Sequence, residues 1–176
     1  MQAPTHLLTG VLIQKMARKW CPLSDRRLPV ASLAVLSHGI LDRLARLTYH
    51  PPAPLSGDWF WVSYHLAITS MAICTSIKHW RTYKLGLICS ILPDLDWLFL
   101  HTSNSLSFQI PLWKEPVLHK LLLSHIDSLP LLGSLNSLPD WTQDRKGVIL
   151  ELALLAMLVT LVHSPRKLNE TTSNGK

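Results

Sequence analysis

Residues 59–77 form the segment that most restricts how this chain can fold. These 19 residues carry no formally charged side chain, and Asp58 and Lys78 bound them on either side. About 20 consecutive apolar residues in a helix span the hydrocarbon core of a bilayer. Trp59, Phe60 and Trp61 open the segment, and aromatic residues are typical of the membrane–water interface. We predict a membrane-crossing helix here, with the buried helix of a soluble bundle as the alternative.

The composition supports an association with lipid. Hydrophobic residues make up 48% of the 176 residues and charged residues only 16%, whereas an average soluble domain has about 25% charged residues. The net charge is +6, and the basic residues form short groups between apolar segments. Such groups suit the cytoplasmic flanks of membrane helices and anionic lipid headgroups. No nucleic-acid-binding motif accompanies them, so we expect membrane lipid as a partner and no nucleic acid.

Helical patterns extend along most of the chain, and no segment alternates as a strand does. We expect Thr5 to cap an amphipathic first helix whose polar face carries Lys15 and Lys19. The further helices are predicted at residues 30–47, 59–77, 83–93, 117–132 (in part) and 148–163. The predicted fold is all-α: a compact helical bundle with two to four membrane-inserted helices. Residues 1–163 would form this single domain, and residues 164–176 a polar, disordered tail.

Two carboxylates, Asp94 and Asp96, interrupt the apolar stretch LICSILPDLDWLFLH. A carboxylate in apolar surroundings costs several kcal/mol unless it is paired or binds a metal. Pro93 disfavours a helical conformation at the residue before it, so the helix should end or kink there. In a turn, both carboxylates can face one cation. Helix capping by one of them is the alternative.

Histidines supply the other candidate ligands. His38 and Asp42 are four residues apart and therefore share one face of the second predicted helix. His6 lies at the start of the first helix. His119 and His125 lie in a leucine-rich segment, but a spacing of six residues places them on different faces of a regular helix.

The abundance of histidine and the scarcity of cysteine indicate a hydrolytic metal site. The chain has nine histidines and only three cysteines, without a C-x-x-C pair. Histidine and aspartate are the ligands of hydrolytic zinc or manganese sites, whereas structural zinc sites use cysteine. Nucleophile-elbow, P-loop and Rossmann glycine patterns are absent from the sequence.

With these motifs, the chain resembles the bacterial membrane-bound metal-dependent hydrolases, a family compared with zinc-dependent phospholipase C proteins. The resemblance rests on T-H-x-x-x-G, S-H-x-x-x-D, P-D-x-D and an H-R-x-x-T-H-S-like segment, carried here by Thr5/His6/Gly10, Ser37/His38/Asp42, Pro93/Asp94/Asp96 and His119/His125. The order of the motifs differs from that of the family, and Trp97 replaces the usual histidine after P-D-x-D. We therefore expect a divergent member, located in the bacterial inner membrane.

The resemblance implies hydrolysis of a phosphoester or ester, with a lipid or another amphiphilic ester as the substrate. We expect a divalent metal, zinc or alternatively manganese, held by His6, His38, Asp42, Asp94, Asp96 and His119. Asp96, as general base, and His125 are the catalytic candidates, and Glu151 is a further candidate for the polar cluster. Two alternatives remain open: a non-enzymatic membrane protein that binds or transports metal, and a protein whose His/Asp residues only pair helices.

Overall fold

The computed structural model describes residues 1–20, 26–51, 55, 57–105 and 115–164. Within this part of the chain all regular structure is helical, which confirms the predicted all-α class. The elements are α1 Ala3–Trp20, α2 Arg27–Leu44, η1 Ala45–Leu47, α3 Trp59–Ile91, η2 Leu92–Asp94, α4 Leu95–Ser105, α5 Val117–Asp127, α6 Pro130–Gly133, η3 Ser134–Ser137 and α7 Gly147–His163.

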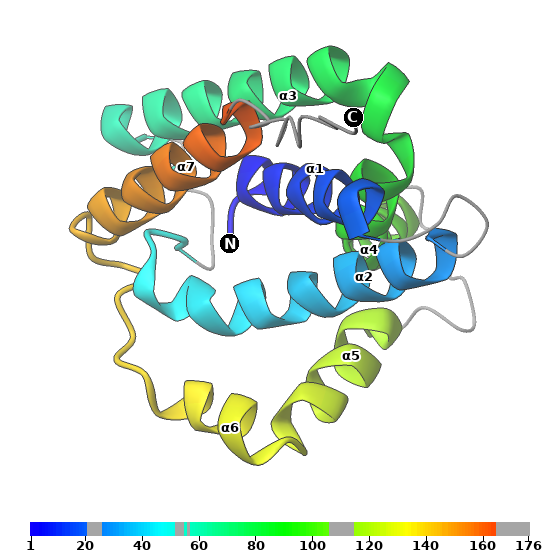
Figure 1. Ribbon diagram of the computed structural model, residues 1–176. Coiled ribbons are helices and arrows are strands. Elements are labelled where there is room, and N and C mark those ends of the chain that lie inside the picture. Colours follow the sequence, from blue (N-terminus) through cyan, green and yellow to red (C-terminus); the bar gives the residue numbers. More distant parts are fainter. Residues whose placement is uncertain (21–25, 52–54, 56, 106–114, 165–176) are drawn as a thin grey trace, which may run out of the picture.

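Helix α1 occupies the middle of the bundle. It packs against α3, α7 and α2, as Figure 1 shows, with α3 and α7 on one side and α2 on the other. The predicted cap at Thr5 is wrong, because the helix already begins at Ala3. Pro4 fits the first turn of a helix, where the backbone N–H that proline lacks has no intrahelical partner. Thr5 is therefore free to point into the core.

The two segments predicted at residues 59–77 and 83–93 form one long helix, α3. Asp58 caps it by accepting a 2.8 Å hydrogen bond from the Phe60 N–H. The polar residues between the two segments are compatible with a helix, so the chain continues through them. The backbone departs from helical values only at Tyr83 (φ −126°, ψ 28°), where the helix kinks.

Helix α3 ends beside Pro93 as predicted, but Leu92 keeps a helical conformation (φ −54°, ψ −41°) and the break falls at Ile91 (φ −113°, ψ 0°). The helix stops at Ile91, and the short 3₁₀ helix η2 contains the proline and Asp94. The chain then continues as α4 to Ser105, beyond the predicted helix end at residue 93. Residues 106–114, and all of the predicted tail 164–176 except residue 164, lie outside the described residues.

Helices α2 and α5 also differ from their predicted bounds. Helix α2 begins at Arg27, because Pro29 is accommodated within the first turn. The region predicted at 117–132 divides into α5 and α6, since Pro130 starts a new short helix.

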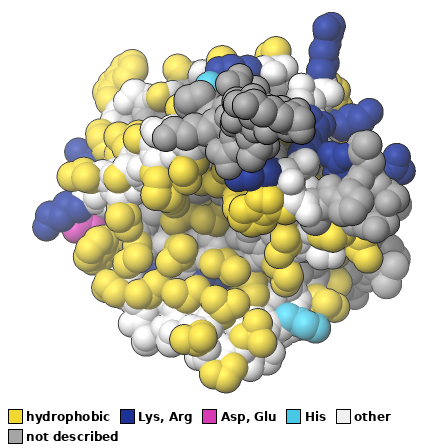
Figure 2. Space-filling view, in the orientation of Figure 1, with side chains coloured by type: hydrophobic (Ala, Val, Ile, Leu, Met, Phe, Trp, Pro, Cys, Tyr) yellow, Lys and Arg dark blue, Asp and Glu magenta, His cyan; other side chains and the backbone are white. Residues whose placement is uncertain are grey.

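Two stretches are long and apolar enough to cross a membrane by length and composition, Arg27–Leu47 and Trp59–Ser103. Much of their surface faces outward: Leu66, Ile73 and Ile77 on α3 are exposed, as are Ile149 and Met157 on the shorter apolar helix α7. Hydrophobic side chains cover a large part of the face shown in Figure 2. This distribution weakly favours membrane association, in line with the prediction.

Candidate metal centre

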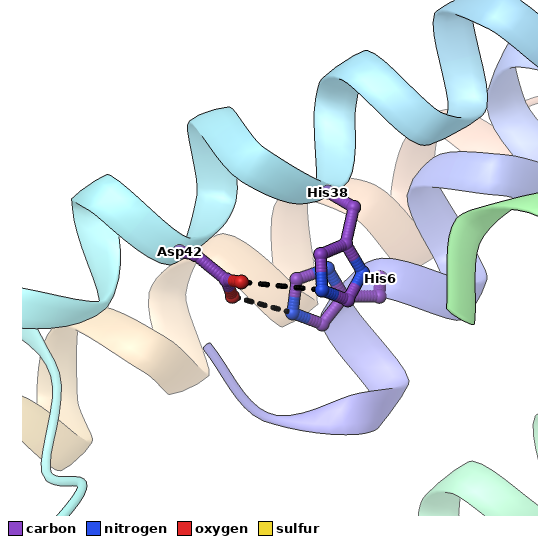
Figure 3. A group of neighbouring side chains, drawn as sticks. All are labelled: His6, His38 and Asp42. Atoms are coloured by element: carbon purple, nitrogen blue, oxygen red, sulfur yellow. Dashed lines mark ion pairs between the residues drawn. The ribbon is translucent and has the colours of Figure 1, made fainter. Parts of the chain in front are cut away.

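Side chains from four separate elements meet beside the N-terminal end of α1. His6 comes from α1, and His38 and Asp42 project from one face of α2, as their four-residue spacing predicted. In Figure 3 the two imidazoles lie one over the other and both face the Asp42 carboxylate. Their ring centroids are 4.0 Å apart. Asp94 from η2 and His119 from α5 approach the His38 imidazole, and His119 also contacts the Asp42 carboxylate.

Three of these ligand atoms form a nearly equilateral triangle. His38 Nε2 lies 3.2 Å from Asp42 Oδ2 and 3.3 Å from His119 Nε2, and His119 Nε2 lies 3.4 Å from Asp42 Oδ2. Asp94 Oδ1 lies 3.5 Å from His38 Nε2 and 3.7 Å from His119 Nε2, so His38, Asp94 and His119 form a second group that is close enough to hold one ion.

The three distances within the triangle match one face of a tetrahedral zinc site. In a regular tetrahedron with edges of about 3.4 Å, the centre lies about 2.1 Å from each corner, which is the length of zinc–nitrogen and zinc–oxygen bonds in proteins. Neighbouring corners of an octahedron at the same spacing would require bonds of about 2.4 Å, too long for magnesium, whose bonds are about 2.0–2.1 Å. The two imidazoles and the Asp42 carboxylate of the triangle therefore fit three ligands of a zinc ion in both chemistry and geometry.

Each of the two histidines in the triangle is oriented through its other ring nitrogen. His38 Nδ1 donates to the backbone carbonyl of Ser90 at 2.7 Å. His119 Nδ1 lies 3.3 Å from Asp96 Oδ2, which also accepts the His119 backbone N–H at 2.8 Å. Histidines that bind metals are commonly held in this way by a carbonyl or a carboxylate, which leaves Nε2 free as the ligand atom.

The two predicted carboxylates thus occupy different positions. Asp96 is fully buried and holds His119 in place, whereas the Asp94 side chain is 43% exposed and faces the ligand atoms directly. From the P-D-x-D turn we expected the Asp94 and Asp96 carboxylates to face one cation. In the structure Asp94 belongs to η2 and Asp96 to the first turn of α4, so the two side chains point to different neighbours.

The second carboxylate oxygen of Asp42 contacts a different histidine and the N-terminal amino group. Asp42 Oδ1 lies 3.3 Å from His6 Nε2 and 3.2 Å from the Met1 amino group. His6, His38 and Asp42 are also close enough to hold one ion. However, His38 has only one nitrogen free, because its Nδ1 is engaged by Ser90. His38 Nε2 can therefore bind a metal ion held by Asp42 and His119, or one held by Asp42 and His6, but it cannot bind both ions at once.

Burial and nearby carboxylates shift the pKa values of His6 and His119 in opposite directions. Burial lowers the pKa of His6 to about 4, although the Asp42 carboxylate opposes this shift. For His119, burial also acts to lower the pKa, but Asp42, Asp96 and Asp94 outweigh it and raise the pKa above the ordinary value. At neutral pH a neutral His6 is suited to donate Nε2–H to Asp42, which makes it a positioning group for that carboxylate.

Glu151 lies directly behind the N-terminal turn that carries His6. Its side chain is completely buried, and Glu151 Oε1 accepts a 2.5 Å hydrogen bond from the Thr5 hydroxyl. Its Oε2 atom and His6 Nδ1 are buried without a hydrogen-bond partner among the described residues. The sequence indicated Glu151 as an isolated charge in an apolar helix, but Ser90 gave no signal because it acts through its backbone.

His125 lies apart from this centre. It is exposed on α5, and its Nδ1 bonds to the Leu121 carbonyl at 3.1 Å. Because α5 is a regular helix, the six-residue spacing turns His125 away from His119, as helical geometry requires. The structure therefore brings together His6, His38, Asp42, Asp94, Asp96 and His119, and leaves the catalytic candidate His125 outside.

No protein-family model, curated protein or solved structure matches this chain.

Proposed function

We propose that the chain is a membrane-bound, zinc-dependent hydrolase, a divergent relative of the bacterial membrane-bound metal-dependent hydrolases. The observation that carries this proposal is the triangle of His38 Nε2, His119 Nε2 and Asp42 Oδ2, with mutual distances of 3.2–3.4 Å. Catalytic zinc sites typically use three protein ligands and keep a fourth position open. The two oriented histidines and the single free nitrogen of His38 support one zinc ion.

The roles of the chain's residues follow from their positions. His38, His119 and Asp42 would hold zinc, which supplies a Lewis acid that lowers the pKa of water and polarises an ester or phosphoryl oxygen. Asp94 would act as the general base, because its carboxylate lies within 3.7 Å of both histidine ligand atoms and is 43% exposed to solvent. This proposal moves the role of base from Asp96 to Asp94, since Asp96 is enclosed and already accepts two N–H groups of His119.

An amphiphilic ester is the substrate class that fits the surroundings. Trp97 lies beside the centre, with its ring centroid 5.7 Å from that of His119, and 47% of the residue is exposed. An exposed indole offers an apolar surface next to the half-exposed Asp94. We place α2 and α3 in the bacterial inner membrane, so that a phosphoester or carboxylic ester of a lipid reaches the centre from the bilayer.

Metal binding without catalysis is the second candidate function, because Asp94 is a possible fourth ligand. If Asp94 binds zinc together with the other three residues, the centre is closed, as structural zinc sites are. The chain would then be a metal-binding membrane protein without hydrolase activity.

One pair of variants separates these functions. We expect full-length protein purified in detergent to contain about one zinc per chain, as expected for a one-metal site, and His119→Ala to lose it. Asp94→Asn should retain zinc and lose hydrolysis of a panel of short-chain phospholipids and carboxylic esters. His125→Gln is the matched control and should retain both.

Two results would count against the proposal. Loss of zinc from Asp94→Asn, together with no hydrolysis by the wild type, would favour the closed metal-binding centre. Wild-type protein without stoichiometric zinc after equilibration with the metal would exclude both metal functions.

A further inference from the structure

A cleft separate from the metal centre lies between the C-terminal part of α1, the start of α2 and the kinked part of α3. Its volume is about 830 Å³. Gln14, on its wall, lies eight residues from His6, and Val30 lies eight residues from His38. Eight residues of helix correspond to about 12 Å. The cleft and the metal centre are therefore different sites on the same three helices.

The cleft is strongly cationic. Among the described residues that line it, five are basic and none is acidic; the five are Arg18, Arg26, Arg27, Arg81 and Lys84. The ion pairs that Arg and Lys side chains form within the described residues all lie elsewhere. Lys and Arg side chains gather toward the right of Figure 2, where these ends of α1, α2 and α3 lie in Figure 1.

Within the described part of the chain, no carboxylate pairs with Arg18 or Arg26. The Nε atom of Arg26 is buried without a hydrogen-bond partner among the described residues. Arg18 bonds to the Thr82 carbonyl, and its guanidinium lies 4.8 Å from the centre of the Tyr83 ring. These contacts fix Arg18 in the wall without neutralising its charge. An anion in the cleft would relieve the mutual repulsion of the cations and supply the missing acceptor.

Apolar residues share the walls with these cations. Val30, Leu85 and Ile88 line the cleft, as does Trp80, which is half exposed. Tryptophan at the edge of an apolar helix is typical of the membrane–water interface. The exposed side chains of Ile73 and Ile77 lie on α3 before Trp80, so the apolar surface continues away from the cleft. A ligand with a phosphate group and acyl chains matches both kinds of lining.

We propose that this cleft binds the headgroup of an anionic phospholipid. The phosphate would pair with the arginines of α2 and α3, and the acyl chains would lie along the apolar surface of α3. The site would fix the depth and rotation of the bundle at the membrane surface. It is independent of hydrolysis, because it contains none of the residues of the metal centre.

Titration of a water-soluble short-chain lipid tests this proposal. Full-length protein in neutral detergent is titrated calorimetrically with dihexanoyl phosphatidic acid, dihexanoyl phosphatidylcholine and inorganic phosphate. We expect phosphatidic acid to bind at least about tenfold more tightly than the other two, because only it combines net charge with acyl chains. Arg26→Gln/Arg81→Gln should weaken its binding about 30-fold, since each basic residue near a lipid surface contributes about fivefold.

A control variant outside the cleft tests whether the loss of affinity is specific to the cleft. Lys120→Gln/Lys146→Gln removes two exposed charges elsewhere and should leave the affinity unchanged. If Arg26→Gln/Arg81→Gln does not fold, as judged by circular dichroism and zinc content, Arg27→Gln/Lys84→Gln replaces it.

Three outcomes would overturn the proposal. Equal binding of inorganic phosphate would indicate a site for the free anion, and equal binding of phosphatidylcholine would indicate an apolar surface only. Tighter competition by a single-stranded RNA oligonucleotide would indicate a nucleic-acid site.

Discussion

The contact between Gly10 of α1 and Gly86 of α3 should be the point at which the bundle tolerates substitution least. A Cβ atom at Gly10 would lie 2.3 Å from the Gly86 carbonyl oxygen, and a Cβ at Gly86 would lie 2.2 Å from the Gly10 carbonyl oxygen. Both obstacles are backbone atoms, so no side-chain rotation relieves the clash. We predict that Gly10→Ala substantially destabilises the fold.

The size of the effect follows from the required movement. Ordinary carbon–oxygen contacts are about 3.3 Å, so the two helices must separate by about 1 Å. Overpacking of this kind costs about 1–3 kcal/mol, and the separation also loosens Leu8, Val11 and Leu87, which are almost fully buried in the core. Because helix propensity favours alanine by up to about 1 kcal/mol, we expect a net loss of about 1–2 kcal/mol in the free energy of unfolding.

The measurement is denaturant or thermal unfolding in detergent. Gly57→Ala is the control, because nothing lies within 4 Å of a Cβ at that position. Gly10→Ala/Gly86→Ala should cost less than the sum of the single variants, since one separation of the helices accommodates both methyl groups. A stability change below about 0.5 kcal/mol for Gly10→Ala would refute the reasoning, because that is within the range of ordinary surface substitutions.

Three further predictions concern the site and its support. Asp96→Asn should weaken zinc binding about 10- to 100-fold, measured by chelator competition, while the helix content stays the same, because it weakens the partner that orients His119. Thr5→Val should lower the free energy of unfolding by about 1–3 kcal/mol, because it removes the hydrogen bond that Thr5 donates to the buried Glu151; Thr5→Ser keeps the hydroxyl and should retain most of the stability, and equal losses in the two variants would contradict this explanation. Removal of zinc by a chelator should lower the thermal midpoint, and restoring free zinc to about 100 times its Kd should return about 2.7 kcal/mol of stability; a midpoint that does not respond would show that the centre binds no metal in the folded state.

Local sequence patterns predicted much of the helical architecture. Charge-free and amphipathic segments predicted the helices, and the proline before Asp94 correctly predicted the end of α3. The four-residue spacing of His38 and Asp42 placed them on one face, since this depends only on helical geometry. The same geometry explains why His125 could not join His119. These features depend on neighbouring residues along the chain, which is why the sequence alone determined them.

Tertiary packing determined the arrangement of the candidate metal centre. His6, Asp94 and His119 are separated by many residues from His38, and only the docking of α1, η2 and α5 onto α2 brings their ligand atoms within a few ångströms. Packing also gave Asp94 and Asp96 different environments and placed the Ser90 carbonyl against His38. A backbone carbonyl carries no residue type, and a spacing of two residues does not fix which side chain faces solvent. The sequence could therefore name the candidate ligands, but only the arrangement of the helices determined which atoms meet.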